Sequence, residues 1–246
     1  MSLTISLVII FITLTHSLFG AGILTFGVPI LLVLGIGFQY ISDILVPLSF
    51  MMSGIILWQD RKYLFFNQYC KNLFIFSLPV LVLFIFLNLH VLNLNILKSV
   101  MALVLILFGL GRWYHPLQNV IFKIIRKVNI LSFMLMGALH GYANMGGSIM
   151  IPLVTMDFHD KIKIRLYNSL SFTLFTLIQM VLSLANKSHH FPNEVLYYLP
   201  LGFFTHYFLG NKIHQKVNAT LFYHLLTILM ITNGLFLAYQ ALPLLF

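Results

Sequence analysis

The sequence predicts an all-helical (all-α) integral membrane protein. Of its 246 residues, 60% are apolar and only 8% are charged, and the mean hydropathy is +0.98. Soluble domains are about 45–50% apolar and about 25% charged. A helix needs about 20 mostly apolar residues to cross the hydrocarbon core, so this length has room for about seven to nine crossings. We expect about seven or eight membrane segments in a single transmembrane domain, 1–246.

Continuously apolar runs identify these segments as helices rather than strands. Residues 73–87 and 100–110 are almost entirely apolar, whereas strands of a membrane barrel alternate apolar and polar residues over about 10 positions. Lipid offers the backbone no hydrogen-bonding partner, which favours helices. The first apolar run follows no Lys or Arg and is too long for the core of a signal peptide, so we expect it to be retained.

The apolar segments follow one another with short connections. In chain order they are 3–36, 40–58, 72–92, 94–111, 129–153, 166–186, 195–210 and 218–240. The first would form about 51 Å of straight helix, much more than the hydrocarbon core of about 30 Å. It must therefore tilt strongly, break or turn back. The connection at 112–128 contains the basic run "KIIRK", which predicts a cytoplasmic linker attracted to anionic lipid.

Two similar motifs lie in the first and fifth segments. Residues 16–29 read "HSLFGAGILTFGVP", and residues 139–152 read "LHGYANMGGSIMIP". Their last residues, Pro29 and Pro152, are 123 positions apart, half of the chain length. Glycine- and proline-interrupted apolar segments in corresponding positions are typical of transporters built from internal repeats.

The segment after each motif also has a counterpart. Ser49-Phe50 in the second segment corresponds to Ser171-Phe172 in the sixth, 122 positions later. The sequence therefore predicts two homologous halves of four segments each, approximately 1–113 and 124–246.

The motifs and the end of the chain resemble a known family. Residues 199–237 read "LPLGFFTHYFLGNKIHQKVNATLFYHLLTILMITNGLFL". Together with the two motifs, this stretch resembles the sulfite exporter TauE/SafE family, which repeats spaced glycines followed by a proline and ends with a Gly-x-x-x-Gly-like helix, a basic turn and an apolar helix. The resemblance implies a membrane transporter of sulfite, sulfonates or related small anions.

The second motif matches the family pattern better than the first. Gly146, Gly147 and Pro152 match it, although Ala143 and Met145 replace two earlier glycines. In the first motif Gly20, Gly22 and Pro29 match, and Ile23 and Leu24 stand where two more glycines are expected.

Two membrane topologies are compatible with these segments. If every segment crosses once, the Lys and Arg residues of the connections divide 8 against 6 between the two sides. If 3–36 and 129–158 instead dip in and return, 12 lie inside against Lys98 and Lys187 outside, which fits the positive-inside rule far better. The re-entrant alternative leaves three crossings in each half, so the halves would be inverted repeats. We prefer it.

The interrupted segments suggest an anion site. A helix that begins at the membrane midplane presents backbone N–H groups and a partial positive charge, while glycine lets a ligand approach the backbone and proline leaves a carbonyl unpaired. The alternative is that small residues merely let helices pack closely. The predicted substrate-binding residues are Gly20, Gly22, Pro29, Asn144, Gly146, Gly147, Ser148, Pro152, Asn168 and Ser169.

Three ionisable residues are candidates for coupling. His16 and His140 lie in the motifs and could donate a hydrogen bond or carry a proton, because histidine titrates near neutrality; each is also compatible with a plain interhelical hydrogen bond. Asp43 lies near the start of 40–58, where it is either a coupling carboxylate or a solvated residue at a helix N-terminus.

Other classes of function are not supported. The charges that give a net +9 lie in short connections, so nucleic-acid binding is not expected. Cys70 is alone, which excludes an intrachain disulfide or a cysteine cluster. No His-Glu-x-x-His or Gly-x-Ser-x-Gly pattern occurs, so we expect no enzyme and no cofactor.

We therefore expect a multi-pass transporter in the inner cell membrane whose partners are a small anion and lipid, with a homo-oligomer left open. The alternatives are a non-transporting scaffold subunit, or a transporter of a carboxylate or a metal-linked solute.

Overall fold

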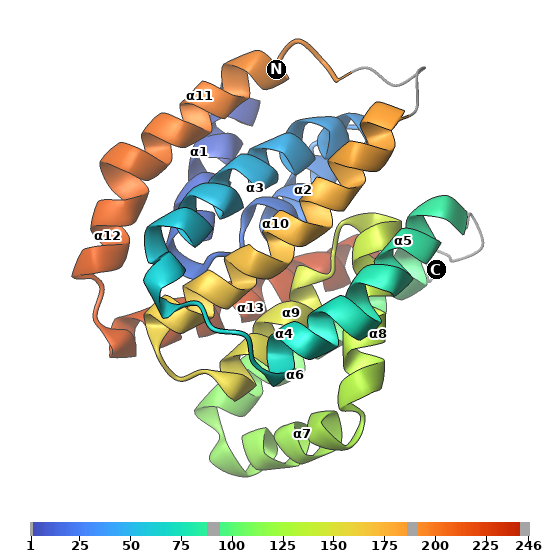
Figure 1. The fold of residues 1–246 in the computed structure, drawn as a ribbon, viewed down its shortest axis with the longest axis vertical. Coiled ribbons are helices and arrows are strands. Elements are labelled where there is room, and N and C mark those ends of the chain that lie inside the picture. The colour runs from blue at the N-terminus through green and yellow to red at the C-terminus, as the bar shows by residue number, and fades with distance from the viewer. Residues whose placement is uncertain (1, 88–93, 186–190, 242–246) are drawn as a thin grey trace.

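The computed structural model describes residues 2–87, 94–185 and 191–241, and these residues form helices and no strand (Figure 1). The first half contains α1 (Ser2–Phe19), α2 (Ile23–Val33), α3 (Phe38–Asp60), η1 (Arg61–Tyr63), α4 (Gln68–Asn72), η2 (Leu73–Ser77), α5 (Leu78–Leu87) and α6 (Leu94–Trp113). The rest of the chain forms α7 (His115–Lys127), α8 (Asn129–Ala143), α9 (Gly147–Asp157), α10 (Lys161–Ala185), α11 (Val195–Thr205), η3 (His206–Gly210), α12 (Asn211–Lys216) and α13 (Ala219–Ala241).

Both motif segments fold as helical hairpins. The predicted run 3–36 is two helices, α1 and α2, interrupted at 20–22, and the predicted run 129–153 is α8 and α9, interrupted at 144–146. We name them hairpin 1 (α1 and α2) and hairpin 2 (α8 and α9). In hairpin 1, Gly22 lies against His16 and Gly27 lies against Ile12, so the two helices run antiparallel. In hairpin 2, Gly146 lies against His140, and the far end of α9 comes back to Arg126 beside the start of α8.

The short helices of the hairpins are too short to cross a membrane. α2 and α9 have 11 residues each, about 17 Å of helix against a core of about 30 Å. Within the described parts of the chain, four helices have the length and apolar composition of a crossing helix: Phe38–Tyr63, Gln68–Phe86, Lys161–Ala185 and Ala219–Tyr239.

Two predicted boundaries change. The connection predicted at 112–128 is mostly helical, because α7 occupies most of it. Pro116 stands in its first turn, where a proline costs no hydrogen bond, and its apolar residues recur at helical spacing. The seventh segment, predicted as 195–210, continues through η3 and α12 to Lys216.

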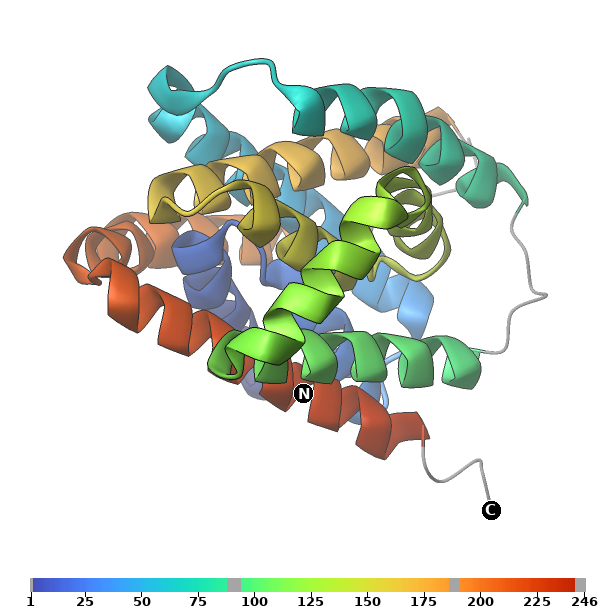
Figure 2. The same ribbon diagram turned by 90° about the horizontal axis from the view of Figure 1, so that it is seen from below.

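The two halves interlock. α3 packs along α10, α6 along α13, α1 on α11, and α5 on α8. The C-terminal end of α3 meets the N-terminal end of α10 through Asp60 and Arg165, so this central pair is antiparallel. Figure 2 shows α6 and α13 on one face and α4 with α5 on the opposite face, with α10 and the hairpins between them. Each half thus contributes helices to the packing of the other.

The elements recur in the same order in each half: a hairpin and then three longer helical stretches. α3 begins at residue 38 and α10 at residue 161, a separation of 123, which equals that of the two prolines. The buried core follows the hairpins and the central pair, and includes Phe19, Ile23, Phe172 and Phe175.

Candidate functional site

The tip of hairpin 1 lies directly on α10. Gly20 has a left-handed backbone, with φ of +67°, and a side chain there would collide with the backbone oxygen of Arg165 and the hydroxyl of Ser169. Only glycine meets both demands without strain. Gly20 therefore fixes the reversal of the chain and its close contact with α10.

The tips of the two hairpins meet in the core. Thr25 in the first turn of α2 lies against Gly147 at the start of α9, where a Cβ atom would collide with the threonine hydroxyl. The ring of Phe172 lies between the two motif histidines, with centroids 5.9 Å from His16 and 5.7 Å from His140. The N-terminal turns of α2 and α9 are thus brought together, as the anion hypothesis requires.

His16 caps the second helix of hairpin 1. Its Nδ1 accepts a 3.5 Å hydrogen bond from the backbone N–H of Ile23, and its Nε2 lies 2.9 Å from the hydroxyl of Ser53 on α3. Because Nδ1 accepts, the ring proton is on Nε2, which donates to Ser53. The sequence left open whether His16 was a coupling group or an interhelical hydrogen bond, and in this structure it makes the hydrogen bond.

Pro29 frees a carbonyl that a distant helix satisfies. Proline has no N–H, so the carbonyl four residues earlier, that of Thr25, loses its helical partner. Asn233 of α13 donates to this oxygen at 3.1 Å. Pro152 occupies the corresponding position of α9 and is buried.

Several buried polar atoms near the tips have no hydrogen-bond partner among the described residues. Asn168 donates through Nδ2 to the carbonyl of Phe19 at 2.9 Å, but its Oδ1 is unpaired. The hydroxyls of Thr25 and Ser169 and both ring nitrogens of His140 are also unpaired. A buried polar atom without a partner costs about 1–3 kcal/mol. The two hydroxyls and the N–H of the His140 ring can donate to an anion, whereas Oδ1 of Asn168 can only accept.

A buried arginine closes one end of this region. Arg165, only 1% exposed, forms an ion pair with Asp60 at 3.0 Å. Its Nη1 and Nη2 donate to the carbonyl of Ser17, the side chain of Gln59 and the side chain of Asn211 at 3.2–3.4 Å. We name these five residues the Arg165 cluster. It ties α1, α3, α10 and α12 together.

A small cavity lies at the other end. It has a volume of about 130 Å³ and is lined by polar side chains of three elements, among them Ser42, Asp43, Asn144 and Gln179. We name it the Asn144 cavity. Asn144 has a left-handed backbone, with φ of 58°; it donates to Ser42 at 2.8 Å and accepts a hydrogen bond from Gln179. Asp43 accepts from Gln39 at 3.0 Å at the exposed side.

One face of α10 connects these two ends. Arg165, Asn168, Ser169, Phe172, Thr176 and Gln179 recur at spacings of three and four residues, which places them on one side of a helix. The 14 positions from Arg165 to Gln179 span about 21 Å. This face passes the tip of hairpin 1, then Phe172, and reaches the Asn144 cavity.

The predicted residues therefore form three groups rather than one cluster. Gly20, Gly22, His16, Asn168 and Ser169 lie at the tip of hairpin 1. Asn144 and Asp43 line the Asn144 cavity. Pro29 lies further along α2 of hairpin 1. The remaining residues belong to hairpin 2: Gly146 against His140, Gly147 against Thr25, Pro152 within α9, and Ser148, whose hydroxyl donates to the carbonyl of Met145 at 3.1 Å.

The sequence interpretation missed Arg165 and Asp60. Arg165 was counted as a connection charge because the sixth segment was started at residue 166, whereas α10 begins at Lys161. The signal was present as the polar residues that follow Arg165 at helical spacing, Asn168 and Ser169.

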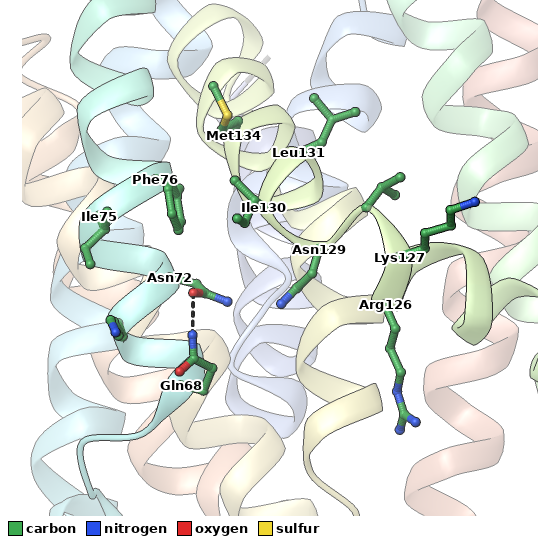
Figure 3. A pocket seen from close by; sticks show the side chains of 12 residues that line it. Gln68, Asn72, Ile75, Phe76, Arg126, Lys127, Asn129, Ile130, Leu131 and Met134 are labelled. Carbon is green, nitrogen blue, oxygen red and sulfur yellow. Dashed lines mark hydrogen bonds between the residues drawn. The ribbon is translucent and has the colours of Figure 1, made fainter.

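Other cavities lie away from the hairpin tips. One of about 700 Å³ lies between α4 with η2 and the junction of α7 and α8 (Figure 3). Another, of about 330 Å³, is lined by Arg112, His159 and Tyr223 among others. Within the described residues, no group of three or more His, Cys, Asp or Glu side chains has the arrangement of a metal site.

Comparison with known proteins gives one finding. The model of the family described as sulfite exporter TauE/SafE matches residues 5–237. Neither the curated proteins nor the solved structures contain a match to the chain.

Proposed function

We propose that this chain, which belongs to the sulfite exporter TauE/SafE family, moves a small sulfur oxyanion or organosulfonate across the inner membrane by alternating access. The family implies a membrane transporter of sulfur anions rather than an enzyme, and the long apolar helices fit a multi-pass membrane protein.

In the proposed topology both hairpins are re-entrant and the halves are inverted repeats. The short helices α2 and α9, about 17 Å long, support this, and so does the antiparallel arrangement of α3 and α10. Hydrogen bonds and cation–π contacts bring Arg112, Lys161, Lys163 and Arg165 to one end of the molecule. We assign this basic end to the cytoplasm.

The polar face of α10 is the observation that carries the proposal. It leads from the closed Arg165 cluster, past both hairpin tips, to the Asn144 cavity. A transporter that alternates needs a site accessible from one side at a time. An arrangement that is packed at one end and hollow at the other supports this proposal.

The substrate site lies where the hairpin tips meet α10. The hydroxyls of Thr25 and Ser169 and the ring of His140 offer donors that have no partner among the described residues. Asn144 has a second amide hydrogen beyond the one given to Ser42. The first turns of α2 and α9 add the favourable end of each helix dipole.

Phe172 separates the cavity from the tip of hairpin 1. Its ring contacts both His16 and His140, so an anion that enters from the Asn144 cavity reaches Ser169 only after this ring moves. A scaffold subunit is the second candidate function, because the same packing of Phe172, Thr25 and Gly147 fills the centre with side chains.

Ligand-dependent thermal unfolding tests the proposal. The purified protein in detergent is heated at fixed ionic strength with sulfite, thiosulfate, sulfonates, carboxylates or chloride. A specific ligand at 100 times its dissociation constant stabilises the protein by about 2.7 kcal/mol. We expect stabilisation by a sulfur anion, and its loss in Asn144→Leu.

Ser183→Ala is the matched control, because Ser183 lines the same cavity and removal of one hydroxyl leaves Asn144 in place. Retained stabilisation in Asn144→Leu would remove this residue from the site. No selective stabilisation by any anion would favour the scaffold, and a shift with carboxylates alone would change the substrate class.

A further inference from the structure

The cavity of about 700 Å³ beside α7 has a polar part and an apolar part (Figure 3). We name it the α7 cavity. Lys71 of α4 and Arg126 and Lys127 of α7 lie along its border, and three amide side chains, Gln68, Asn72 and Asn129, line its polar part. Its wall further along α8 and η2 is apolar. Cationic, amide and apolar regions thus follow one another within a single hollow.

The polar part offers hydrogen-bond donors. Gln68 donates to Oδ1 of Asn72 at 2.9 Å, and the Nδ2 group of Asn72 then points across the cavity toward the side chain of Asn129 (Figure 3). None of the residues that line this cavity is acidic. Asp157, at the end of α9, interacts electrostatically with Arg126 from outside the lining, so the net charge of the lining is still positive.

The apolar wall faces outward. Ile75, Ile130 and Leu131 line the cavity and are 49%, 52% and 52% exposed. Side chains of this kind are stable at the surface of a membrane protein where acyl chains cover them. A soluble anion would use the cations and amides but would leave this wall uncovered.

The amphipathic helix α7 places the cavity at the depth of lipid headgroups. Its apolar residues Val120 and Ile124 are 56% and 57% exposed, whereas Lys123, Arg126 and Lys127 are charged. A helix of this composition lies in the interface, with its apolar side toward the acyl chains. The α7 cavity opens at the end of that helix, where α8 begins.

We propose that the α7 cavity binds the headgroup of an anionic phospholipid. The phosphate lies among Lys71, Arg126 and the amides, and the acyl chains run along the exposed wall formed by Ile75, Ile130 and Leu131. The lipid would join α4 and η2 of the first half to α7 and α8, which connect the halves.

Native mass spectrometry of the delipidated protein tests this site. Phosphatidylglycerol and phosphatidylcholine with identical acyl chains are titrated in the same detergent. We expect the anionic lipid to bind with higher affinity, and the double variant Lys71→Gln/Arg126→Gln to lose about 30-fold of that affinity, or about fivefold per charge. Affinity for phosphatidylcholine should change little.

The control is Lys62→Gln/Lys123→Gln, which removes the same charge from the same end of the molecule but from outside the cavity lining. Equal loss in this control would reduce the effect to general surface charge. Equal binding of the two lipids by the unaltered protein would overturn the proposal, whatever the variants do. Glycerol phosphate, the headgroup without chains, should not displace the lipid; displacement at the same concentration would assign the cavity to a soluble anion.

Discussion

The two ends of the α10 polar face are built from different chemistry at corresponding positions. Arg165 lies 123 positions after Ser42, the separation that also relates the two motif prolines. Each contacts the neighbouring hairpin: Arg165 donates to the carbonyl of Ser17, and Ser42 accepts from Asn144. One end is built on the Arg165–Asp60 ion pair and is packed. The other has the amides of Asn144 and Gln179 beside the carboxylate of Asp43 and borders a cavity of about 130 Å³.

The difference shows how similar backbones give a closed and an open end. A buried guanidinium must be paired and hydrogen-bonded, since an isolated buried charge is very unfavourable. Arg165 is therefore bonded to four acceptors from three helices, α1, α3 and α12. Amides and hydroxyls such as Asn144 and Ser42 tolerate water and exchange partners at lower cost. Asn144 and Ser42 can consequently exchange their hydrogen bonds with a ligand at a lower cost than Arg165 can give up its ion pair.

The largest expected effect concerns the side of the membrane that each end faces. Single cysteines are placed in a Cys70→Ser background, one at Lys163 beside the Arg165 cluster and one at Gln39 in the lining of the Asn144 cavity. Re-entrant hairpins place the two positions on opposite sides, so an impermeant thiol reagent should label Gln39→Cys from outside and Lys163→Cys only from inside. Labelling of Lys163→Cys from outside would refute this topology. Labelling of both positions from one side would show that the Arg165 cluster and the Asn144 cavity do not face opposite sides of the membrane.

Removal of the arginine charge should have the next largest effect. Arg165→Gln leaves the partly buried carboxylate of Asp60 without its ion pair, and breaking a buried pair costs about 3–5 kcal/mol. Thermal unfolding in detergent should show this loss of stability. Lys212→Gln, an exposed neighbour on α12, should change stability by less than about 0.5 kcal/mol. The double variant Asp60→Asn/Arg165→Gln also removes the carboxylate that the single variant leaves unpaired. If it is as unstable as Arg165→Gln, the ion pair itself contributes little to stability.

A smaller effect separates backbone strain from close packing at the hairpin tip. Gly20 and Gly35 both have positive φ values, +67° and +75°, but a Cβ at Gly35 would meet nothing within 4 Å. Gly35→Ala should therefore cost about 1–2 kcal/mol through its backbone conformation alone. Gly20→Ala should cost more, because the new methyl group also collides with the backbone of Arg165. Equal losses on thermal unfolding would mean that the contact with α10 is not tight.

Much of the fold follows from local features of the sequence. Apolar composition determines the membrane class because any helix in lipid must present such side chains. Gly20, Gly22 and Gly146 lie at the interruptions of hairpins 1 and 2, and each motif proline lies inside the helix that follows, since the effects of these residues on the backbone are local. The TauE/SafE family membership predicted from these motifs is confirmed over residues 5–237.

The candidate site was less accessible to sequence reasoning. Asn144 and Ser148 were both predicted to bind substrate, yet Asn144 lines the cavity while Ser148 bonds within its own turn. His16 and His140 have different surroundings, because one caps α2 and the other lies among Phe172 and Phe175. The chain is interrupted between Asn144 and Ser148, at 144–146, so helical spacing does not relate the two side chains, and their neighbours are set by packing against other helices.

The sequence by itself determined that this chain is a helical membrane protein of the TauE/SafE family with two interrupted segments, because hydropathy and glycine and proline content act over a few residues. Only the tertiary structure decided that Arg165 is a buried partner of Asp60, 105 positions away, rather than one more charge in a connection. A single buried charge has no preferred location until the fold brings its acceptors together. The closed end and the cavity are therefore properties of the packed helices, and no local pattern predicts which end contains which.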